Sequence, residues 1–251
     1  MARVPTGESV VSRGIRVIEA FGVDDASLTV SDIARRSGLH IATASRLIEE
    51  FVSLGWLERD GRRVRIGVRL WEVASRASPT LSLREAAMPF MEDIHAVVGH
   101  HTQLAVLEGD EVLFVERLSA PGGAVNYSRI AGRLPLYQSS SGLVLLANGP
   151  VELQERIIRE PMTGYTPASL RTGRQLRAEL ADVRRRDYAF CPGWIYPETT
   201  GIAAPIRDSR NLVVAAVALV VPNDAAARTL VPALQAAARG ISRVMSAKSL
   251  A

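Results

Sequence analysis

The 251-residue sequence has one cysteine, one lysine and few aromatic side chains. Cys191 cannot form an internal disulfide, and the four histidines do not stand with it at the spacing of zinc ligands. No apolar run approaches the roughly 18 residues that cross a bilayer, and residues 1–12 lack the pattern of a signal peptide. These absences predict a cytoplasmic protein without a metal or other cofactor.

What is present points to folded domains. Apolar residues make up 47% of the chain and charged residues 22%, which is enough to form one or two ordinary cores and excludes a disordered chain. The net charge is only +4, and 29 of the 30 basic residues are arginine. Between Thr29 and Arg69, however, eight arginines stand against five acidic residues. This local excess, more than the whole-chain charge, suggests a nucleic-acid partner.

Three short helices are expected before residue 55. The first has a wide apolar stripe that predicts a buried face, formed by Val10, Val11, Ile15, Val17, Ile18 and Phe21. The second begins near Thr29, which forms a capping-box-like pair with Asp32, and ends at Gly38. The third covers residues 41–54. The last two helices and their short connection form a helix-turn-helix candidate.

A β-hairpin is expected directly after the third helix. Asp60 and Gly61 form a dipeptide typical of a two-residue hairpin turn, flanked by strand-like residues 56–59 and 62–66. In this register Arg63 and Arg65 face solvent. Three helices followed by a hairpin are the order of a winged helix-turn-helix domain, so double-stranded DNA is the expected partner.

The third helix should enter the major groove by its N-terminal end, because Glu49 and Glu50 stand a turn later and repel phosphates. Arg46 is the best candidate to bind guanine, since its guanidinium can donate two bonds to O6 and N7. Other arginines are expected on phosphates or in the minor groove. The full predicted DNA-binding set is Arg35, Arg36, Thr43, Ser45, Arg46, Arg62, Arg63 and Arg65. The alternative is a winged helix that docks another protein.

The predicted secondary structure changes twice along the remaining chain. Residues 68–74 predict an amphipathic linker helix that breaks near Ser78 and Pro79, and residues 83–98 predict a longer helix. Strands are expected from residue 102, at 102–107, 112–118, 124–128, 188–191, 201–206 and 212–221, with helices between and after them. This order predicts an α+β fold with an antiparallel sheet. The predicted domains are 1–67 (DNA-binding), 68–82 (linker helix) and 83–251 (effector-binding).

Several sequence blocks, in their order, resemble the IclR family of bacterial transcriptional regulators. The blocks are residues 33–39 (IARRSGL), 45–47 (SRL), 55–57 (GWL), 104–109 (LAVLEG), 132–136 (GRLPL), 141–142 (SG) and 203–206 (AAPI). The resemblance covers about residues 9–247. It implies an N-terminal winged helix-turn-helix, a linker helix and a GAF-like domain that binds a small effector. It also implies a homodimer or homotetramer that acts on operator DNA, here expected to control a catabolic operon.

A cluster of hydroxyls marks the expected effector site. Ser139, Ser140 and Ser141 stand at a predicted helix start, where hydroxyls and free amides can hold a carboxylate without a fixed positive charge. Ordinary helix capping is the alternative. The family resemblance implies a pocket that this loop and Cys191 both line, and the aromatic residues Phe190 and Trp194 stand within three residues of Cys191 in the sequence. The residues that the resemblance implies for this pocket are Asn126, Leu134, Ser140, Ser141, Cys191, Gly201, Ala218 and Val220. The expected set is completed by Ser139, Phe190 and Trp194.

Departures from the family pattern bear on specificity. Tyr137 and Leu143 stand where His and Lys are common, Cys191 where an acidic or polar residue is common, and Ala218 and Val220 where Ser is common. The pocket should therefore be less polar than one for very small acids, and a small aromatic or other bulky organic acid or derivative is the expected effector.

Enzymatic alternatives have less support in the sequence. Cys191 with His100 or His101 is a possible nucleophile and base, which would make the chain a hydrolase. Cys191 alone is a possible thiol redox sensor, although no second cysteine can resolve an oxidised thiol. The serine cluster lacks the Gly-x-Ser-x-Gly elbow of hydrolases, and no dinucleotide or phosphate loop is present. We therefore expect a regulator that is not an enzyme.

Overall fold

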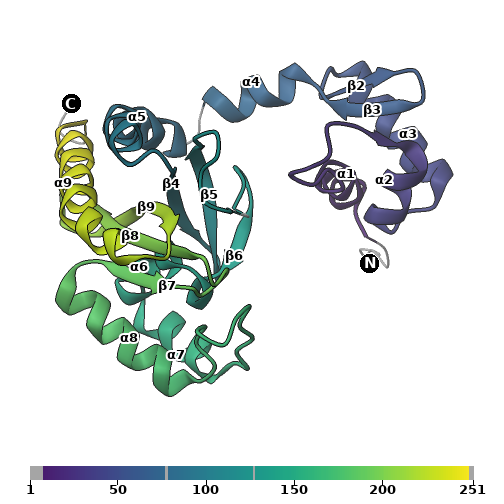
Figure 1. Cartoon of the computed structure of the whole chain (residues 1–251). Helices are drawn as coiled ribbons and strands as arrows, with labels where there is room; N and C mark the ends of the chain where they lie inside the picture. Colours follow the sequence, from purple (N-terminus) through teal and green to yellow (C-terminus); the bar gives the residue numbers. More distant parts are fainter. Residues whose placement is uncertain (1–7, 77–78, 127, 249–251) are drawn as a thin grey trace. The chain divides into compact units, whose positions relative to one another are not determined.

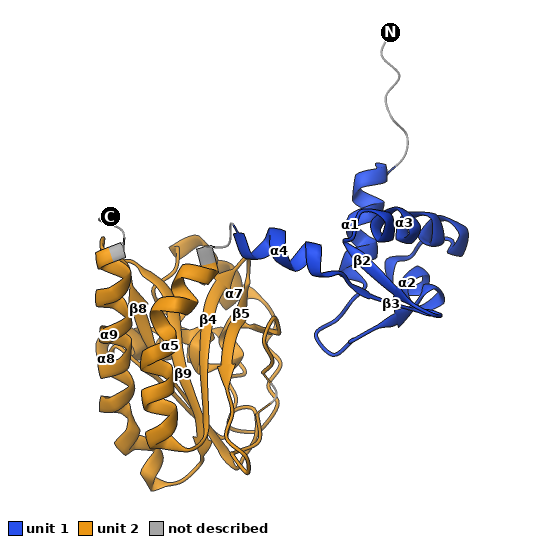
Figure 2. Ribbon diagram, turned by 90° about the horizontal axis from the view of Figure 1, so that it is seen from above, with its two compact units in different colours: residues 1–79 blue, residues 80–251 orange. Residues whose placement is uncertain are grey.

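The chain forms two compact units. The computed structural model describes residues 8–76, 79–126 and 128–248. Unit 1 comprises Met1–Pro79 and unit 2 comprises Thr80–Ala251 (Figure 2). Unit 1 has one hydrophobic core, and unit 2 has a core on each face of its sheet. Each unit therefore has its own apolar interior, as an independent domain does.

Unit 1 contains the predicted helices. Its first elements are α1 (Val10–Glu19), the short strand β1 (Leu28–Thr29), α2 (Val30–Ser37) and α3 (Ile41–Ser53) (Figure 1). The Thr29 hydroxyl caps α2, accepting a bond from the Asp32 amide at 3.1 Å and donating one to its carboxylate at 2.7 Å. At the other end, Gly38 has a φ of +65°, a left-handed conformation that glycine adopts at little cost. Helix α2 thus begins and ends where the sequence predicts.

The wing is a hairpin of β2 (Leu57–Asp60) and β3 (Arg63–Ile66), joined by β1 in the order β1-β3-β2. Asp60 pairs with Arg63, so the turn consists of Gly61 and Arg62, and the predicted Asp60-Gly61 turn is wrong by one residue. Glycine meets the turn's need for a positive φ, which is +57° at Gly61. The shift places Arg62 at the wing's tip. Helix α4 (Val68–Arg76) follows the wing.

Helix α1 buries less of its apolar stripe than expected. Val17 is fully buried, but Val10, Val11 and Ile15 are 59%, 71% and 52% exposed. The expectation of one wide buried face is therefore wrong for these three residues. Helix α4 has no buried residue at all, and its Trp71 is 66% exposed. The core of unit 1 is formed by Val17, Ala20, Leu28, Ile33, Leu47, Ile48, Leu57 and Val64.

Unit 2 is built on a six-stranded antiparallel sheet with the order β6-β5-β4-β9-β8-β7. The strands are β4 (His101–Glu108), β5 (Glu111–Leu118), β6 (Arg133–Pro135), β7 (Ala189–Pro192), β8 (Thr199–Arg207) and β9 (Val213–Pro222). The predicted α+β class with an antiparallel sheet is confirmed. The strand predicted at 124–128 is wrong, because residues 124–126 and 128 form none, and β6 was not predicted.

Helices cover both faces of this sheet (Figure 1). Helices α5 (Pro79–Val98) and α9 (Val231–Lys248) pack on one face, and a short 3-10 segment (Ala225–Leu230) precedes α9. Helices α6 (Ser140–Ala147), α7 (Val151–Arg159) and α8 (Gly173–Arg186) pack on the other. Helix α5 begins at Pro79, earlier than the predicted residue 83, and Ser78 of the predicted break lies outside the described residues.

Among the described residues, no helix combines the length and apolar character needed to span a membrane. The same residues contain no group of three or more His, Cys, Asp or Glu side chains arranged to hold a metal ion.

Candidate functional site

Helix α3 presents a free cation near its N-terminal end. His40 caps the helix, with its Nδ1 accepting from the Ala42 amide at 3.4 Å. Ala44, Leu47 and Ile48 face the core and leave Arg46 exposed on the outer side. Within the described chain Arg46 forms no hydrogen bond or ion pair, so its five donors are available to a ligand. The predicted residues Thr43 and Ser45 lie beside it and are half-buried.

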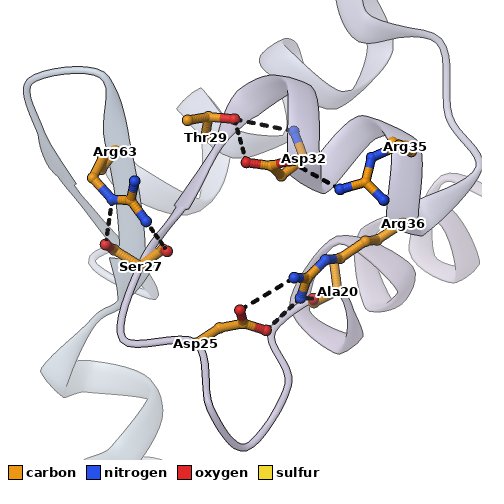
Figure 3. Close-up of polar contacts among 8 residues, drawn as sticks. All are labelled: Ala20, Asp25, Ser27, Thr29, Asp32, Arg35, Arg36 and Arg63. Atoms are coloured by element: carbon orange, nitrogen blue, oxygen red, sulfur yellow. Dashed lines mark hydrogen bonds and ion pairs between the residues drawn. The ribbon is translucent and has the colours of Figure 1, made fainter.

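Two other predicted DNA-binding arginines are occupied within the protein (Figure 3). Arg36 donates to the Ala20 carbonyl at 3.0 Å and pairs with Asp25, which fixes the loop after α1 against α2. Arg35 pairs with Asp32 at 3.0 Å but is 70% exposed along its side chain. The hydrogen bond from Arg36 lowers the pKa of Asp25, and bonds from Thr29 and Arg35 lower the pKa of Asp32 to about 2. Arg36 therefore has a structural role.

The wing arginines divide in the same way. Arg63 binds the loop before β1, because its Nε donates to the Ser27 hydroxyl and its Nη2 to the Ser27 carbonyl, both at 2.6 Å (Figure 3). Arg65 pairs with Glu58 across the hairpin at 2.7 Å. Arg62, at the tip, has no partner in the described chain. Arg46 and Arg62 are therefore the predicted arginines that unit 1 leaves unpaired.

Unit 2 contains a cavity of about 380 Å³ on the sheet face that α6 covers. Its floor comes from Gln103, Phe114, Cys191, Thr199, Gly201 and Val220 of the sheet, and its sides from Val125, Asn126, Ser128, Leu134, Gln138, Ser139, Ser140, Ser141, Tyr165, Trp194, Ile195 and Tyr196. No charged residue is among these described lining residues. The cavity is thus mainly apolar with a few neutral polar groups, which is the usual make-up of a small-molecule site.

The serine cluster forms one polar side of the cavity. Ser139 caps α6, since its hydroxyl accepts from the Gly142 amide at 3.1 Å. Ser140 and Ser141 are buried and line the cavity, and their hydroxyls have no partner among the described residues. Their amides lie in the first turn of the helix, where no carbonyl of the helix can reach them. One serine therefore caps the helix, and the other two remain free to bind.

A second polar group lies in the loop between β5 and β6. The Ser128 amide and hydroxyl donate to Asn126 Oδ1 at 3.0 and 2.9 Å, and Gln103 donates to the Ser128 hydroxyl. The buried Asn126 Nδ2 has no hydrogen-bond partner in the described chain, and neither has the buried Gln138 Oε1. Each is a buried polar atom that a bound molecule can satisfy.

Nine of the eleven predicted effector residues line this cavity. Phe190 does not: it alternates with Cys191 along β7, packs on the opposite sheet face and lies under the Arg228 guanidinium at 4.3 Å. Ala218 is packed in the core beside the cavity without lining it. Lining residues that the prediction missed include Gln103, Phe114 and Tyr165. The first two occupy strand positions whose inward side the sequence alone does not fix.

Cys191 is placed poorly for chemistry. It is buried, and this burial raises the pKa of its thiol well above the usual value. His101 lies in the same cross-sheet row, through the pairs Cys191–Gly201, Gly201–Val220 and Val220–His101. Three strand spacings separate the two residues by about 14 Å. This distance argues against a cysteine–histidine hydrolase.

A winged helix-turn-helix with a free cation on its recognition helix, joined to a domain with an uncharged cavity, is the architecture of an effector-responsive transcriptional regulator. The model of the bacterial transcriptional regulator IclR C-terminal domain matches residues 76–243, and the IclR helix-turn-helix model matches residues 10–61. The chain belongs to the IclR family and is a DNA-binding transcriptional regulator of that type.

Solved structures and named proteins that are similar to this chain support the family assignment. An IclR homologue from Microbacterium hydrocarbonoxydans, crystallised with 4-hydroxybenzoate, is 44% identical with a TM-score of 0.92, over 94% of this chain and 99% of that one. The p-hydroxybenzoate hydroxylase transcriptional activator of Acinetobacter baylyi is 26% identical, over 82% of this chain and 78% of that protein. The regulator XynR of Escherichia coli is also 26% identical, over 83% and 84%.

Proposed function

We propose that unit 2 binds an aromatic monocarboxylic acid in its cavity and that this acid controls the affinity of unit 1 for operator DNA. The observation that carries the proposal is the pairing of apolar walls with the free donors of Ser140 and Ser141. Phe114, Leu134 and Trp194 offer surface to a ring, and the first turn of α6 offers hydroxyls, amides and the positive end of its dipole to a carboxylate. The 4-hydroxybenzoate complex of the 44% identical homologue supports the same class of ligand.

The absence of charge among the described lining residues sets the specificity. A single carboxylate is held by dipoles and hydrogen bonds, and a second carboxylate would be buried without any such partner. We therefore expect benzoate and 4-hydroxybenzoate to bind, and terephthalate and benzamide to bind at least about tenfold more weakly. Cyclohexanecarboxylate has an aliphatic ring of similar size, so its affinity shows whether binding depends on the shape of the ring or on its aromatic character.

Calorimetry with these five compounds tests the proposal. Ser141→Trp fills the cavity beside the helix start and should abolish binding, whereas Ser209→Trp, at an exposed turn, should leave it unchanged. If none of these compounds binds the wild-type protein, the ligand class is wrong. If Ser141→Trp binds as tightly as the wild type, the site lies elsewhere.

For the DNA half, we propose that Arg46 contacts a base with Thr43 and Ser45 beside it, and that Arg62 contacts a phosphate or the minor groove at the wing. Arg35 is available for a further phosphate contact because most of its side chain is exposed. Binding to the upstream region of the chain's own gene, measured with and without the acid, tests the coupling. A location in the bacterial cytoplasm, with control of a catabolic operon, follows from this role.

We propose that the protein acts as a homodimer or a homotetramer. In unit 1, α1 exposes Val10, Val11 and Ile15, and α4 exposes Val68 and Trp71. Apolar side chains grouped on helices in this way are typical of a contact surface. Light scattering on the full chain with Val11→Glu and Ile15→Glu together tests the self-association. The double variant should lower the oligomeric state, and an unchanged mass would place the interface elsewhere.

A further inference from the structure

Glu116 is an acidic residue that is buried in the described chain, and it belongs to neither proposed binding site. It lies on β5, and its side chain is 6% exposed. Its Oε2 pairs with Arg84 Nε of α5, and its Oε1 accepts from the Arg117 amide at 2.8 Å. Burying a carboxylate costs free energy that an apolar residue of the same size would not. The position therefore calls for an explanation beyond stability.

A β-bulge places Glu116 on the α5 side of the sheet. Leu104 pairs with Glu116 and Ala105 pairs with Phe114, so Val115 is an extra residue in β5. Phe114 faces the cavity, whereas Val115 packs in the cluster formed with α5 and α9. Without the bulge, strict alternation would put Glu116 on the cavity side with Phe114. With it, Glu116 reaches α5 and Arg117 returns to the cavity side.

Arg117 connects this strand to the cavity wall. Its guanidinium donates to the Ser128 carbonyl, and Ser128 also holds Gln103 and Asn126 through its hydroxyl. Asn126, Ser128 and Gln103 all line the cavity. Polar contacts thus run from the cavity through Ser128 to the Arg117 side chain, and from the Arg117 backbone amide through Glu116 to Arg84.

Arg84 lies near the point at which the chain enters unit 2. Thr80 is the first residue of that unit and belongs to the first turn of α5, and Arg84 is one turn further along. A change at this end of α5 therefore acts at the start of unit 2, next to the boundary between the two units. Half of the Arg84 side chain is exposed, so water can solvate its guanidinium when it leaves Glu116. The cost of breaking the pair falls on the buried Glu116 carboxylate, which then keeps only the bond from the Arg117 amide.

We propose that the Arg84–Glu116 ion pair is the positioning contact that couples occupancy of the cavity to the DNA-binding unit. This inference rests on the proposed function. A ligand that bonds to Asn126 or Gln103 displaces Ser128 and Arg117, and so changes how Glu116 holds Arg84. The structure has the ion pair formed, and its loss on ligand binding would give the second arrangement that a coupling element requires.

The test compares Arg84→Gln, Glu116→Gln and the double variant with the wild type. Calorimetry gives the affinity for 4-hydroxybenzoate, and fluorescence anisotropy gives the operator affinity with and without it. We expect acid binding within about threefold of the wild type in all variants, and a response of operator affinity that is at least about fivefold smaller. Each single variant breaks the same ion pair, so the double variant should lose as much of the operator response as either single variant.

Arg177→Gln is the matched control, because it removes another ion pair of unit 2, with Glu155 at 2.6 and 3.1 Å between α7 and α8. It should keep the full response. If a single variant fails to fold, the double variant decides, since it removes both charges of the pair and leaves no carboxylate buried without a partner. Retention of the wild-type response by Arg84→Gln would overturn the proposal.

An experiment without ligand tests this inference independently of the proposed function. Val220→Phe fills the cavity from its floor and takes the place of a bound molecule. It should change operator affinity, and adding Arg84→Gln should remove that change. If the wild type binds no acid but this result is obtained, the proposed ligand is wrong and the coupling stands. If Val220→Phe has no effect, or the same effect with Arg84→Gln, the coupling is wrong.

Discussion

The backbone at Gly142 lies directly against Leu136. A Cβ on Gly142 would be 2.2 Å from the Leu136 carbonyl oxygen, which is far inside van der Waals contact. Leu136 begins the single 3-10 turn that precedes α6, and Gly142 is the third residue of α6. This close approach fixes the serine-bearing start of α6 at the cavity.

We expect Gly142→Ala to displace α6 from that turn. The backbone cannot yield as a flexible side chain would, so unfolding free energy should fall by about 1–3 kcal/mol and binding of the aromatic acid should be lost. Urea denaturation and calorimetry measure the two effects. Ser141→Ala, one residue earlier, adds no atom and should change stability by less than about 1 kcal/mol. Unaltered stability in Gly142→Ala would mean that the contact is not rigid.

Arg46 and Arg62 should contribute to DNA binding in different ways. If Arg46 binds a guanine edge, Arg46→Ala should cost about 1–3 kcal/mol of operator affinity and relax the preference at one base pair. If Arg62 contacts phosphate, Arg62→Ala should weaken binding to all sequences alike and reduce the salt slope by about one. Anisotropy titrations over a salt series, with single-base operator variants, measure both. An unchanged base preference in Arg46→Ala would show that Arg46 does not bind the edge of a base.

The difference between Arg46 and Arg36 shows what the sequence could not supply. Both arginines stand in the helix-turn-helix at positions that the pattern allows to face DNA. Arg36 binds Ala20 and Asp25, which are 16 and 11 residues away, and such partners depend on how the loop after α1 folds back. Helix periodicity gives the side on which a residue lies but not its partner. The helices could therefore be predicted and the free cations could not.

Unit 2 shows the same limit. The long strands and α6 to α8 could be predicted, because their apolar patterns are extended and their ends carry caps such as Thr172 and Gln175. The three-residue β6 carries no such pattern. The cavity draws on residues from Gln103 to Val220, and only the sheet order brings them together. The bulge at Val115 also breaks the alternation from which the face of Glu116 would be inferred.

Cys191 should be unreactive in the folded protein. Burial raises its pKa, so little thiolate exists near neutral pH, and only the thiolate attacks electrophiles. We expect iodoacetamide to label native protein far more slowly than protein in urea, as mass spectrometry can follow. Peroxide should leave operator binding unchanged in both the wild type and Cys191→Ser. Rapid labelling, with loss of binding confined to the wild type, would instead support a thiol redox sensor.

His101 holds the loop beside the cavity through a hydrogen bond from its Nε2 to the Ala124 carbonyl. Its Nδ1 is buried without a partner in the described chain. Desolvation lowers the pKa of His101 below 6.5, and the positive charge of Arg117 and the nearby His100 and His95 act in the same direction. The folded protein therefore resists protonation of this ring.

This pKa shift makes stability depend on pH. As pH falls through 6.5 the unfolded chain takes up a proton at His101 before the folded chain does, so unfolding free energy decreases until pH reaches the folded pKa. His101→Gln keeps a donor for Ala124 and removes the titration. Urea denaturation between about pH 5.5 and 7.5 should therefore give a steeper loss of stability on acidification for the wild type than for His101→Gln. Equal slopes for the two proteins would show that His101 titrates alike in the folded and unfolded chains.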